Sequence, residues 1–475
     1  MNTRHPARSR APAQPLLTLS LLALLTGCAS TPPLPPATPL PVVAAFRASA
    51  ATPANPGTAP GQAPTDWWAA FEDATLSTLV QRALAQNTQI DLAAARLTQA
   101  RASLKSADAE RLPQLQAGAA ATRQGGPLIN AAGASGSLFQ AGISAQADAD
   151  LFGRLRLAQT AAGHRAAEHE ALLRATQLLV QTDVAHSYLR LRALDAERQL
   201  ARQAWLSQRE TLALVEQRWA SGSITELDLQ RARADTLAAE AESLQLDRER
   251  QQTQHALALL LGEPASRFSL PEDATWQARW PQVPAGIPSD MLARRPDVHA
   301  AQQALLAAQA KRGEVRASAF PSLLLTAAGG QASPSLSTLL QASLRAWSVG
   351  ALLSAPLFDG GAQAARESDA DAEVMAQHAQ FRGQVLLAFK DVEDQLVALQ
   401  AWRQQEAVLA QAATAAQRAQ ALAESRWKNG LASQLELLQA RRTAWKAERQ
   451  RLQAAAAQGS ATVSLVKALG GGWRS

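Results

Sequence analysis

Cys28 is the residue in this chain best suited to covalent chemistry. A thiol is intrinsically very nucleophilic, and Cys28 is the only cysteine among the 475 residues. It follows directly on Leu25-Thr26-Gly27, so small residues precede the sulfur. Because no second cysteine is present, no disulfide within the chain competes for this thiol. The sequence therefore points to modification of Cys28.

The residues before Cys28 are arranged like a secretory signal. Residues 4–10 carry three arginines, and the apolar stretch 16–25 that follows is too short to span a bilayer. The arrangement resembles a bacterial lipoprotein signal, in which the cysteine sulfur receives a diacylglyceryl group and cleavage frees the cysteine amine for an N-acyl chain such as palmitate. An ordinary cleaved signal followed by an unmodified thiol is the alternative.

We therefore predict that residues 1–27 are removed and that Cys28 carries S-diacylglycerol and N-acyl lipid. Ala29 and Ser30 follow the cysteine in place of Asp. By resemblance to lipoprotein sorting, this favours the outer membrane. Residues 28–65 are rich in Pro, Ala and Thr, which is typical of an extended linker between the lipid and a folded body.

The other residue types that perform chemistry show no catalytic spacing. His164 and His169 are five residues apart and poorly placed to share a helix face, so we expect no metal site. Gly329-Gly330 lacks the strand-loop-helix context of a phosphate-binding loop. No hydroxyl and carboxylate spacing suggests a nucleophile with its base. We predict no catalytic residues, no enzyme activity and no cofactor besides the lipid.

The charge pattern argues against a nucleic-acid partner. The formal net charge is +6, and it falls to about +3 without Arg4, Arg8 and Arg10 of the signal. The remaining arginines alternate with Glu and Asp along segments of helical composition. This is typical of solvated helix faces, whereas nucleic-acid binding needs a clustered basic patch.

A sixteen-residue segment that occurs twice organises the chain. Arg218–Arg233 reads RWASGSITELDLQRAR, and Arg426–Arg441 reads RWKNGLASQLELLQAR. In register, Gly222 aligns with Gly430. Each copy lies between two long Ala-, Leu- and Gln-rich segments, and its glycine falls where the first helix must stop and reverse. We predict that each copy is the tip of a helical hairpin.

The hairpins are unusually long. Residues 154–220 and 363–428 contain no proline, and each would form a helix of about 65 residues, or roughly 100 Å. Residues 226–261 and 433–469 are predicted to return from the tips. The scarcity of aromatic residues and the abundance of Ala suit helices with small side chains at close contacts.

Alternating segments precede each hairpin. Apolar and polar residues alternate over 138–151 and again over 347–357, and shorter strands are predicted at 114–122 and from Pro321 onward. Period-two alternation over this length is the signal of a transmembrane barrel strand. Helix, strand pair and hairpin thus occur twice in the same order.

Four strands cannot close a barrel. Closed barrels begin at about 8 strands, and an open sheet edge in lipid leaves backbone groups unpaired. Several chains must therefore share one barrel, and the Ala- and Leu-rich helices likewise need neighbours. The alternative is a coiled-coil lipoprotein with soluble strands, which leaves the matched strand pairs unexplained.

Short motifs accompany these elements in a specific order. They are Asp66-Trp67-Trp68 with Phe71 and Asp73, Leu151-Phe152-Gly153-Arg154, Leu292-Ala293-Arg294-Arg295-Pro296-Asp297-Val298, Pro356-Leu357-Phe358-Asp359-Gly360-Gly361, and the two tips. With them the chain resembles the TolC family of bacterial outer-membrane efflux channels, and more narrowly its lipoprotein branch (NodT-type), which serves resistance-nodulation-division (RND) pumps. The resemblance covers nearly all of the mature chain.

The resemblance implies a mixed α and β membrane protein. It implies a homotrimer with a shared 12-stranded transmembrane β-barrel, four strands per protomer, and an α-helical barrel about 100 Å long through the periplasm of a Gram-negative bacterium. Each protomer would comprise the signal 1–27, the lipidated linker 28–65 and the channel domain 66–475, with structural repeats at about 66–263 and 288–470.

The resemblance also implies a passive duct. An inner-membrane RND-type pump supplies the energy, and a periplasmic adaptor joins the pump to the duct. Drugs, dyes or metal ions then leave through the lumen of the duct, which crosses the outer membrane lipid. A nonspecific diffusion porin is an alternative, although a porin has no use for long periplasmic helices. A structural envelope lipoprotein is another.

Carried over residue by residue, the resemblance places a periplasmic gate at the tips. Asp228 and Trp427 occupy positions of an inter-hairpin contact that holds the closed state. Glu436 and Gln439 occupy positions where the family has two rings of acidic residues. This chain departs at Gln439, which is neutral, and at Ala432, where some members carry an Arg latch. One carboxylate ring at Glu436 is left, and we hypothesise that it prefers cations.

The tips are also the surface at which the resemblance expects the adaptor to dock. Arg218, Gly222, Arg426 and Gly430 mark that surface. Gly222 and Gly430 have a physical reason to be glycine, because the tight reversal and close docking leave little room for a side chain.

Overall fold

The structure, a computed structural model, describes residues 46–47, 66–125, 136–273, 276, 279–284, 288–341 and 345–471. The chain divides into two units, Met1–Leu40 and Pro41–Ser475, and every described residue belongs to the second. The signal 1–27, Cys28 and the linker 28–65 apart from residues 46–47 lie outside the described residues.

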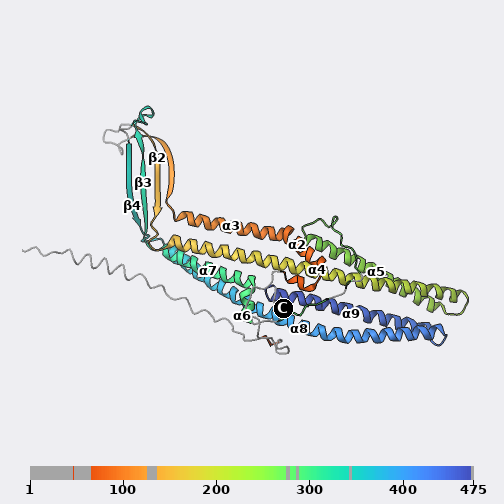
Figure 1. Cartoon of the computed structure of the whole chain (residues 1–475). Coiled ribbons are helices and arrows are strands. Elements are labelled where there is room, and N and C mark those ends of the chain that lie inside the picture. The colour runs from red at the N-terminus through yellow and green to blue at the C-terminus, as the bar shows by residue number, and fades with distance from the viewer. Residues whose placement is uncertain are drawn as a thin grey trace, which may run out of the picture. The chain divides into compact units, whose positions relative to one another are not determined.

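The first half of the described chain runs from short helices through a strand pair into a long hairpin (Figure 1). In chain order its elements are η2 (Trp67–Phe71), α2 (Ala74–Gln86), α3 (Thr88–Glu110), β1 (Gln114–Gln124), β2 (Gly136–Asp148), α4 (Arg154–Ala220) and α5 (Glu226–Leu260).

The second half repeats this order. Its elements are α6 (Pro288–Arg294), α7 (Pro296–Ala317), β3 (Ser322–Ser333), the short η3 (Leu336–Thr338), β4 (Arg345–Ser354), α8 (Ala362–Lys428) and α9 (Gln434–Ala468). The predicted combination of long helices with four strands is confirmed. No helix within the described ranges has both the length and the apolar character needed to cross a membrane.

The four strands form one antiparallel sheet in the order β1-β2-β3-β4. The register aligns the alternating residues of neighbouring strands, so the two faces of the sheet differ in composition. One row across the sheet is Ala117, Ile143, Gly329 and Trp347, and the next is Gln116, Ser144, Ala328 and Ser348. The first face is therefore apolar over most of its length, with Arg123, Gln331 and Arg345 at one end, and the second face carries most of the other polar side chains.

The end of β2 corrects the sequence prediction. The alternation suggested a strand up to Leu151, but β2 ends at Asp148. Asp150 has a φ of 44°, and its carboxylate accepts hydrogen bonds from the backbone N–H groups of Leu155 (2.9 Å) and Arg156 (3.0 Å). Asp150 thus satisfies free donors of the first turn of α4, so it belongs to the helix start.

The end of β4 is corrected for the same reason. This strand ends at Ser354 and not near Leu357. The Asp359 carboxylate accepts from the backbone N–H groups of Gly361 (3.1 Å) and Gln363 (2.6 Å). An aspartate that follows the preceding strand therefore caps the start of each long helix.

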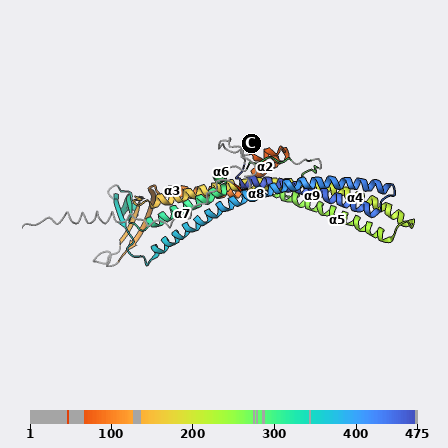
Figure 2. The ribbon, with the colours of Figure 1, turned by 90° about the horizontal axis from the view of Figure 1, so that it is seen from below.

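The long helices pack side by side along their length (Figure 2). α4 packs against α3 and α7 over one part of its length and against α5 over the other, and α8 packs in the same way against α7 and α9. α4 also contacts α9, which joins the two hairpins.

Two apolar clusters surround the middles of α4 and α8. The first contains Tyr188 and is covered by η2 and α2. The second contains Val392 and includes side chains from α6, α7 and α9. The segment 66–87 packs in this way against α4.

His186 at the contact of α4 with α9 gives a pH prediction. Its Nδ1 lies 3.1 Å from Ser460 Oγ and its Nε2 3.3 Å from Ser464 Oγ. Burial, aided by the Lys467 charge, lowers the pKa of His186 from 6.5 to about 4. The unfolded chain binds a proton below pH 6.5 that the folded chain excludes until about pH 4. The free energy of unfolding should fall across this window by up to about 3 kcal/mol.

Thermal unfolding of the purified protein between pH 7 and pH 4 checks this. His186→Gln keeps a polar partner for the serines and should flatten the loss of stability with falling pH. His255→Gln is the matched control, because His255 is exposed on α5. An unchanged pH profile in His186→Gln would contradict the assignment.

Candidate functional site at the hairpin tips

The first tip is built by a specific C-terminal cap. Gly222 has a φ of +70°, and its N–H donates to Trp219 O at 2.9 Å. The N–H of Ser223 donates to Arg218 O, also at 2.9 Å. This pair of bonds is a Schellman motif, which uses the last free carbonyls of α4 while the chain reverses.

The second tip has the same cap. Gly430 has a φ of +71°, and the N–H groups of Gly430 and Leu431 donate to Trp427 O (3.0 Å) and Arg426 O (2.8 Å). A Cβ at Gly222 or Gly430 would meet no described atom within 4 Å. Within one chain the need for glycine is therefore the left-handed backbone, rather than the lack of room that the sequence suggested.

The returning helices begin with side-chain caps, and this is where Asp228 acts. Thr225 Oγ1 accepts from the Asp228 N–H at 3.3 Å, and the Asp228 carboxylate accepts from the Thr225 backbone N–H at 3.4 Å and from its hydroxyl at 2.7 Å. The two residues form a capping box that starts α5. Ser433 caps α9 at the aligned position by accepting from the Glu436 N–H at 3.1 Å. Both copies carry a hydroxyl residue three positions before an acidic one, and this spacing is the sequence signal of both caps.

The contact between the two tips pairs Trp427 with Arg218. The Arg218 guanidinium carbon lies 5.1 Å from the centroid of the Trp427 ring, which is a cation–π geometry. Trp427 thus contacts the first hairpin, and its described partner there is Arg218. The Asp228 side chain hydrogen-bonds to Thr225 of its own helix.

A second link lies about two turns from the tips. Arg441 Nη1 donates to Thr211 Oγ1 at 2.8 Å, from α9 across to α4. Arg441 Nη2 also lies 3.6 Å from Glu424. The aligned Arg233 pairs with Glu216 at 3.1 Å within the first hairpin. Of these two aligned arginines, Arg441 contacts the other hairpin and Arg233 pairs within its own, a difference that the sequence could not show.

The acidic residue of the second tip has a basic neighbour. Glu436 Oε1 lies 4.0 Å from Arg426 Nη1, and both side chains are about half exposed. Gln439 is exposed on the next turn of α9. Each chain therefore presents one carboxylate here, and the field of that carboxylate is partly offset by Arg426.

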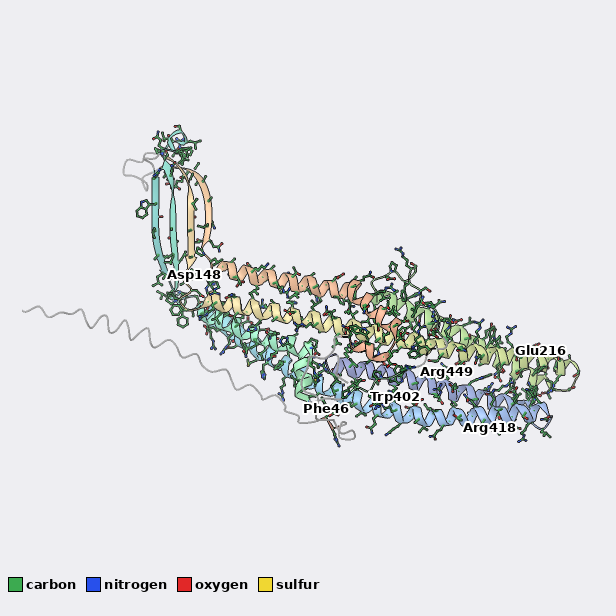
Figure 3. All side chains as sticks on the ribbon, viewed as in Figure 1. Phe46, Asp148, Glu216, Trp402, Arg418 and Arg449 are labelled. Carbon is green, nitrogen blue, oxygen red and sulfur yellow. The ribbon has the colours of Figure 1, made fainter. Side chains whose placement is uncertain are left out.

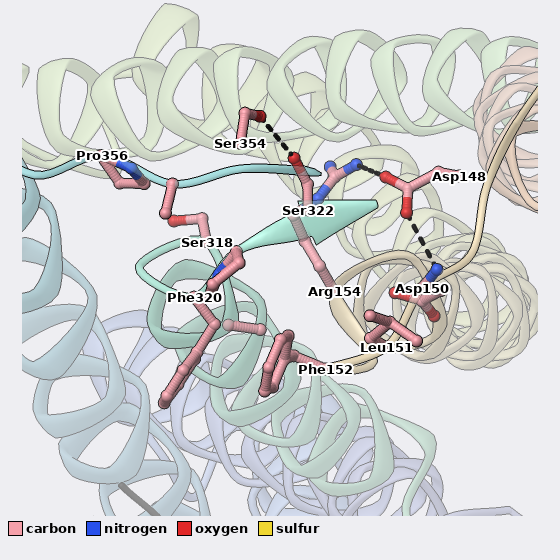
Figure 4. A pocket seen from close by; sticks show the side chains of 13 residues that line it. Asp148, Asp150, Leu151, Phe152, Arg154, Ser318, Phe320, Ser322, Ser354 and Pro356 are labelled. Atoms are coloured by element: carbon pink, nitrogen blue, oxygen red, sulfur yellow. Dashed lines mark hydrogen bonds and ion pairs between the residues drawn. The ribbon is translucent and has the colours of Figure 1, made fainter. Parts of the chain in front are cut away.

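A cavity of about 500 Å³ lies where the strands meet the helices (Figure 4). Arg154 Nη2 pairs with Asp148 at 3.0 Å on one side, and Ser322 Oγ lies 3.1 Å from Ser354 Oγ on another. Phe152 and Phe320 stack with ring centroids 4.8 Å apart, which joins the two repeats. Across the described ranges, no three His, Cys, Asp or Glu side chains gather closely enough to hold a metal ion.

The chain, with its two long helical hairpins and its four-stranded sheet, is similar to known proteins in sequence and in structure. The family profile described as "Outer membrane efflux protein" matches residues 79–263 and 287–471. The chain belongs to the outer membrane efflux protein family. This confirms the family that the sequence motifs suggested, and the chain is the outer-membrane exit duct of an efflux system.

Relatives from curated proteins are similar over most of their length. The outer membrane protein OprJ of Pseudomonas aeruginosa is 33% identical, with 86% of each chain covered. The pyoverdine export outer membrane protein OpmQ of the same species is 34% identical, with 97% of each chain covered. The cation efflux system protein CusC of Escherichia coli K12 is 32% identical over 86% of this chain and 88% of its own.

Solved structures of similar proteins share the fold. The outer-membrane channel OprN superposes with a TM-score of 0.83 at 30% identity, covering 92% of this chain and 99% of its own. A CusC structure gives a TM-score of 0.81 at 28% identity, covering 93% and 99%. These proteins are outer membrane channels of efflux systems.

Proposed function

We propose that three copies of this chain assemble into one duct with a shared 12-stranded barrel in the outer membrane. The observation that carries the proposal is the open sheet. β1 and β4 are its edges, and one face is apolar over most of its length. Unpaired edges cannot persist in lipid, so the edges of neighbouring copies pair. Exposed leucines on the helices, such as Leu237, Leu244 and Leu387, supply contacts between copies in the periplasm.

Disulfide trapping tests this assembly. Ala117→Cys on β1 is combined in turn with Trp347→Cys, Val349→Cys or Ala351→Cys on β4. All four positions lie on the same face. We expect oxidation to link chains into species of two and three times the monomer mass. Oxidation within single chains only would mean that one copy closes its own sheet.

The matched control is a pair inside the sheet. Ala145 and Ala327 are partners in the β2–β3 register. Ala145→Cys with Ala327→Cys should therefore form a disulfide within one chain and leave the monomer mass unchanged. If the β1–β4 cysteine pairs gave cross-linked dimers but no cross-linked trimers, a three-chain barrel would be contradicted.

The duct serves a tripartite system in this proposal. An RND-type inner-membrane pump drives export, a periplasmic adaptor docks on the tips around Gly222 and Gly430, and the chain itself performs no catalysis. The relatives' names support small molecules or ions as cargo, since they include cation efflux, pyoverdine export and toluene efflux. Deletion should abolish resistance to the cargo, and re-expression should restore it only with the cognate pump present. Restoration without the pump would favour a diffusion porin, and no conductance in planar bilayers would favour a structural lipoprotein.

Cys28 carries the lipid anchor in this proposal. Its position after small residues and its status as the sole cysteine support the assignment. Radiolabelled palmitate should enter the full chain and be lost in Cys28→Ser.

Glu436 supplies the single carboxylate ring of the closed gate, at which Trp427 and Arg218 hold the two hairpins together. Three carboxylates in a narrow aqueous neck attract cations, and Arg426 weakens that preference. We expect Glu436→Gln to lower the cation-to-anion permeability ratio by roughly two- to threefold in single-channel recordings, for about 0.5 kcal/mol of lost attraction. Gln439→Ala, which changes no charge, is the control. An unchanged ratio in Glu436→Gln would remove Glu436 from the gate.

A further inference from the structure

Phe46 is buried in a cluster whose other buried members are more than two hundred residues away in the sequence. Its side chain is 2% exposed in the second apolar cluster, and it lies beside α8 (Figure 3). The N–H of Arg47 donates to Glu393 Oε1 of α8 at 2.6 Å. The buried partners come from four helices: Met291, Val298, Val385, Ala388, Val392, Leu399, Ala461, Leu465, Ala468 and Leu469.

The internal repeat explains why the second cluster needs Phe46. A shift of 208 residues, the distance from Gly222 to Gly430, superposes the two clusters. It carries Val180, Val184, Leu257 and Leu261 of the first cluster onto Ala388, Val392, Leu465 and Leu469 of the second.

The covering of the two clusters differs. Trp67, Trp68 and Phe71 with the thirteen-residue α2 cover the first. At the aligned place the second has α6, which is seven residues long. Phe46 is the one aromatic residue among the fully buried described members of that cluster. Among the described residues, a segment from outside the repeat thus covers the second cluster where η2 and the longer α2 cover the first.

The position of Phe46 also bears on the lipid. Arg47 is the nineteenth residue after Cys28, and the six prolines among residues 28–46 make the composition typical of an extended chain. At about 3.1 Å per residue such a chain reaches about 59 Å. From the start of α8 at Ala362, beside the strands, to Glu393 the helix rises about 47 Å. The extended chain is therefore only a few residues longer than the distance along α8 from Glu393 to the strands.

We propose that the second apolar cluster is a docking site for the lipid-bearing segment of this chain. Phe46 fastens the segment to α8, so the chain between body and lipid is 28–45 rather than the whole linker 28–65. The dock fixes how far the body can lie from the membrane face. The effect on reach rests on the proposed acylation of Cys28, whereas the docking itself does not.

Hydrogen exchange on the full-length protein tests the docking. The Arg47 amide should exchange slowly because of its bond to Glu393, and Phe46→Ala should speed exchange of the peptide around it at least tenfold. Arg47→Ala is the matched control, since the Arg47 side chain is exposed and the backbone bond remains. Equal exchange in the wild type and Phe46→Ala, with α8 unchanged, would overturn the proposal.

A shortened segment tests the reach. Deletion of residues 31–38 makes Arg47 the eleventh residue after Cys28, so the chain between them spans at most about 40 Å. We expect a several-fold loss of chain from the outer-membrane fraction. Adding Phe46→Ala to the deletion should restore the fraction, because the released linker gains the residues up to Asp66. A shortened chain that inserts normally while Phe46 is intact would refute the fixed reach.

The Cys28→Ser background separates the two proposals. Without lipid the deletion should have no effect on insertion, whereas the exchange difference between the wild type and Phe46→Ala should persist. If palmitate is absent from the wild type, the anchor proposal fails and the exchange experiment still decides the docking.

Discussion

Replacement of Asp195 by alanine is expected to lower the free energy of unfolding by about 3 to 5 kcal/mol. Asp195 lies in the middle of α4, and its side chain is 1% exposed. One carboxylate oxygen accepts from Arg250 Nε at 2.6 Å, and the other accepts from Arg192 Nη1 at 3.1 Å and from the Asp273 N–H at 3.2 Å. Removing this carboxylate leaves the buried guanidinium groups of Arg192 and Arg250 without the negative charge that Asp195 provides.

The same cluster fastens the link after α5 to the first hairpin. Arg192 donates to Pro271 O and Arg250 to Leu270 O, each at 2.9 Å. Thermal unfolding and trypsin cleavage of the link would both report the loss, since the link should open before the helices unfold. We expect faster cleavage within residues 262–273 at temperatures where α4 is still folded.

The control is an exposed ion pair of similar geometry. Arg279 Nη1 lies 2.8 Å from Glu72, and the two side chains are 71% and 68% exposed. Arg279→Ala should change stability by no more than about 0.5 kcal/mol, because water screens the pair. If Asp195→Ala is as mild as Arg279→Ala, the buried cluster does not stabilise this part of the chain.

The helices were predictable because backbone chemistry limits them. Proline-free stretches, a glycine at each reversal and a proline at the start of α7 all act locally, so the bounds of α4, predicted as 154–220, agree with the structure. The strand ends were less predictable. Alternation continued by chance past Asp148, and the capping role of Asp150 depends on the start of α4.

The contacts that define the site depend on tertiary structure. The sequence aligned Arg233 with Arg441, but only the packing of α9 on α4 brings Arg441 to Thr211. It aligned Asp228 with Glu436, yet Asp228 closes a capping box with Thr225 and Glu436 approaches Arg426. A residue such as Phe46, alone in a Pro- and Ala-rich segment, carries no periodic signal at all.

Gly330→Val is expected to reduce the assembled protein in the outer membrane at least tenfold. Gly330 of β3 pairs with Gly142 of β2. A Cβ on Gly330 would overlap Ala141 O and lie 2.6 Å from Gly142 Cα, and a Cβ on Gly142 would lie 2.7 Å from Gly329 O. These obstacles are backbone atoms, so no side-chain rotation relieves them. The strands must separate instead and lose ladder hydrogen bonds, which costs several kcal/mol for each group left unpaired in lipid.

Gly329→Val, one residue earlier, is the control that isolates this cause. A Cβ on Gly329 meets nothing within 4 Å, and it lies on the apolar face in the row of Ile143 and Trp347. Valine there adds apolar surface to that face and should leave the outer-membrane fraction near the wild-type amount. Because β2 belongs to the first repeat and β3 to the second, the close approach at Gly330 lies where the strand pairs of the two repeats join. If Gly330→Val assembles as well as Gly329→Val, β2 and β3 can move apart in the assembled barrel without loss.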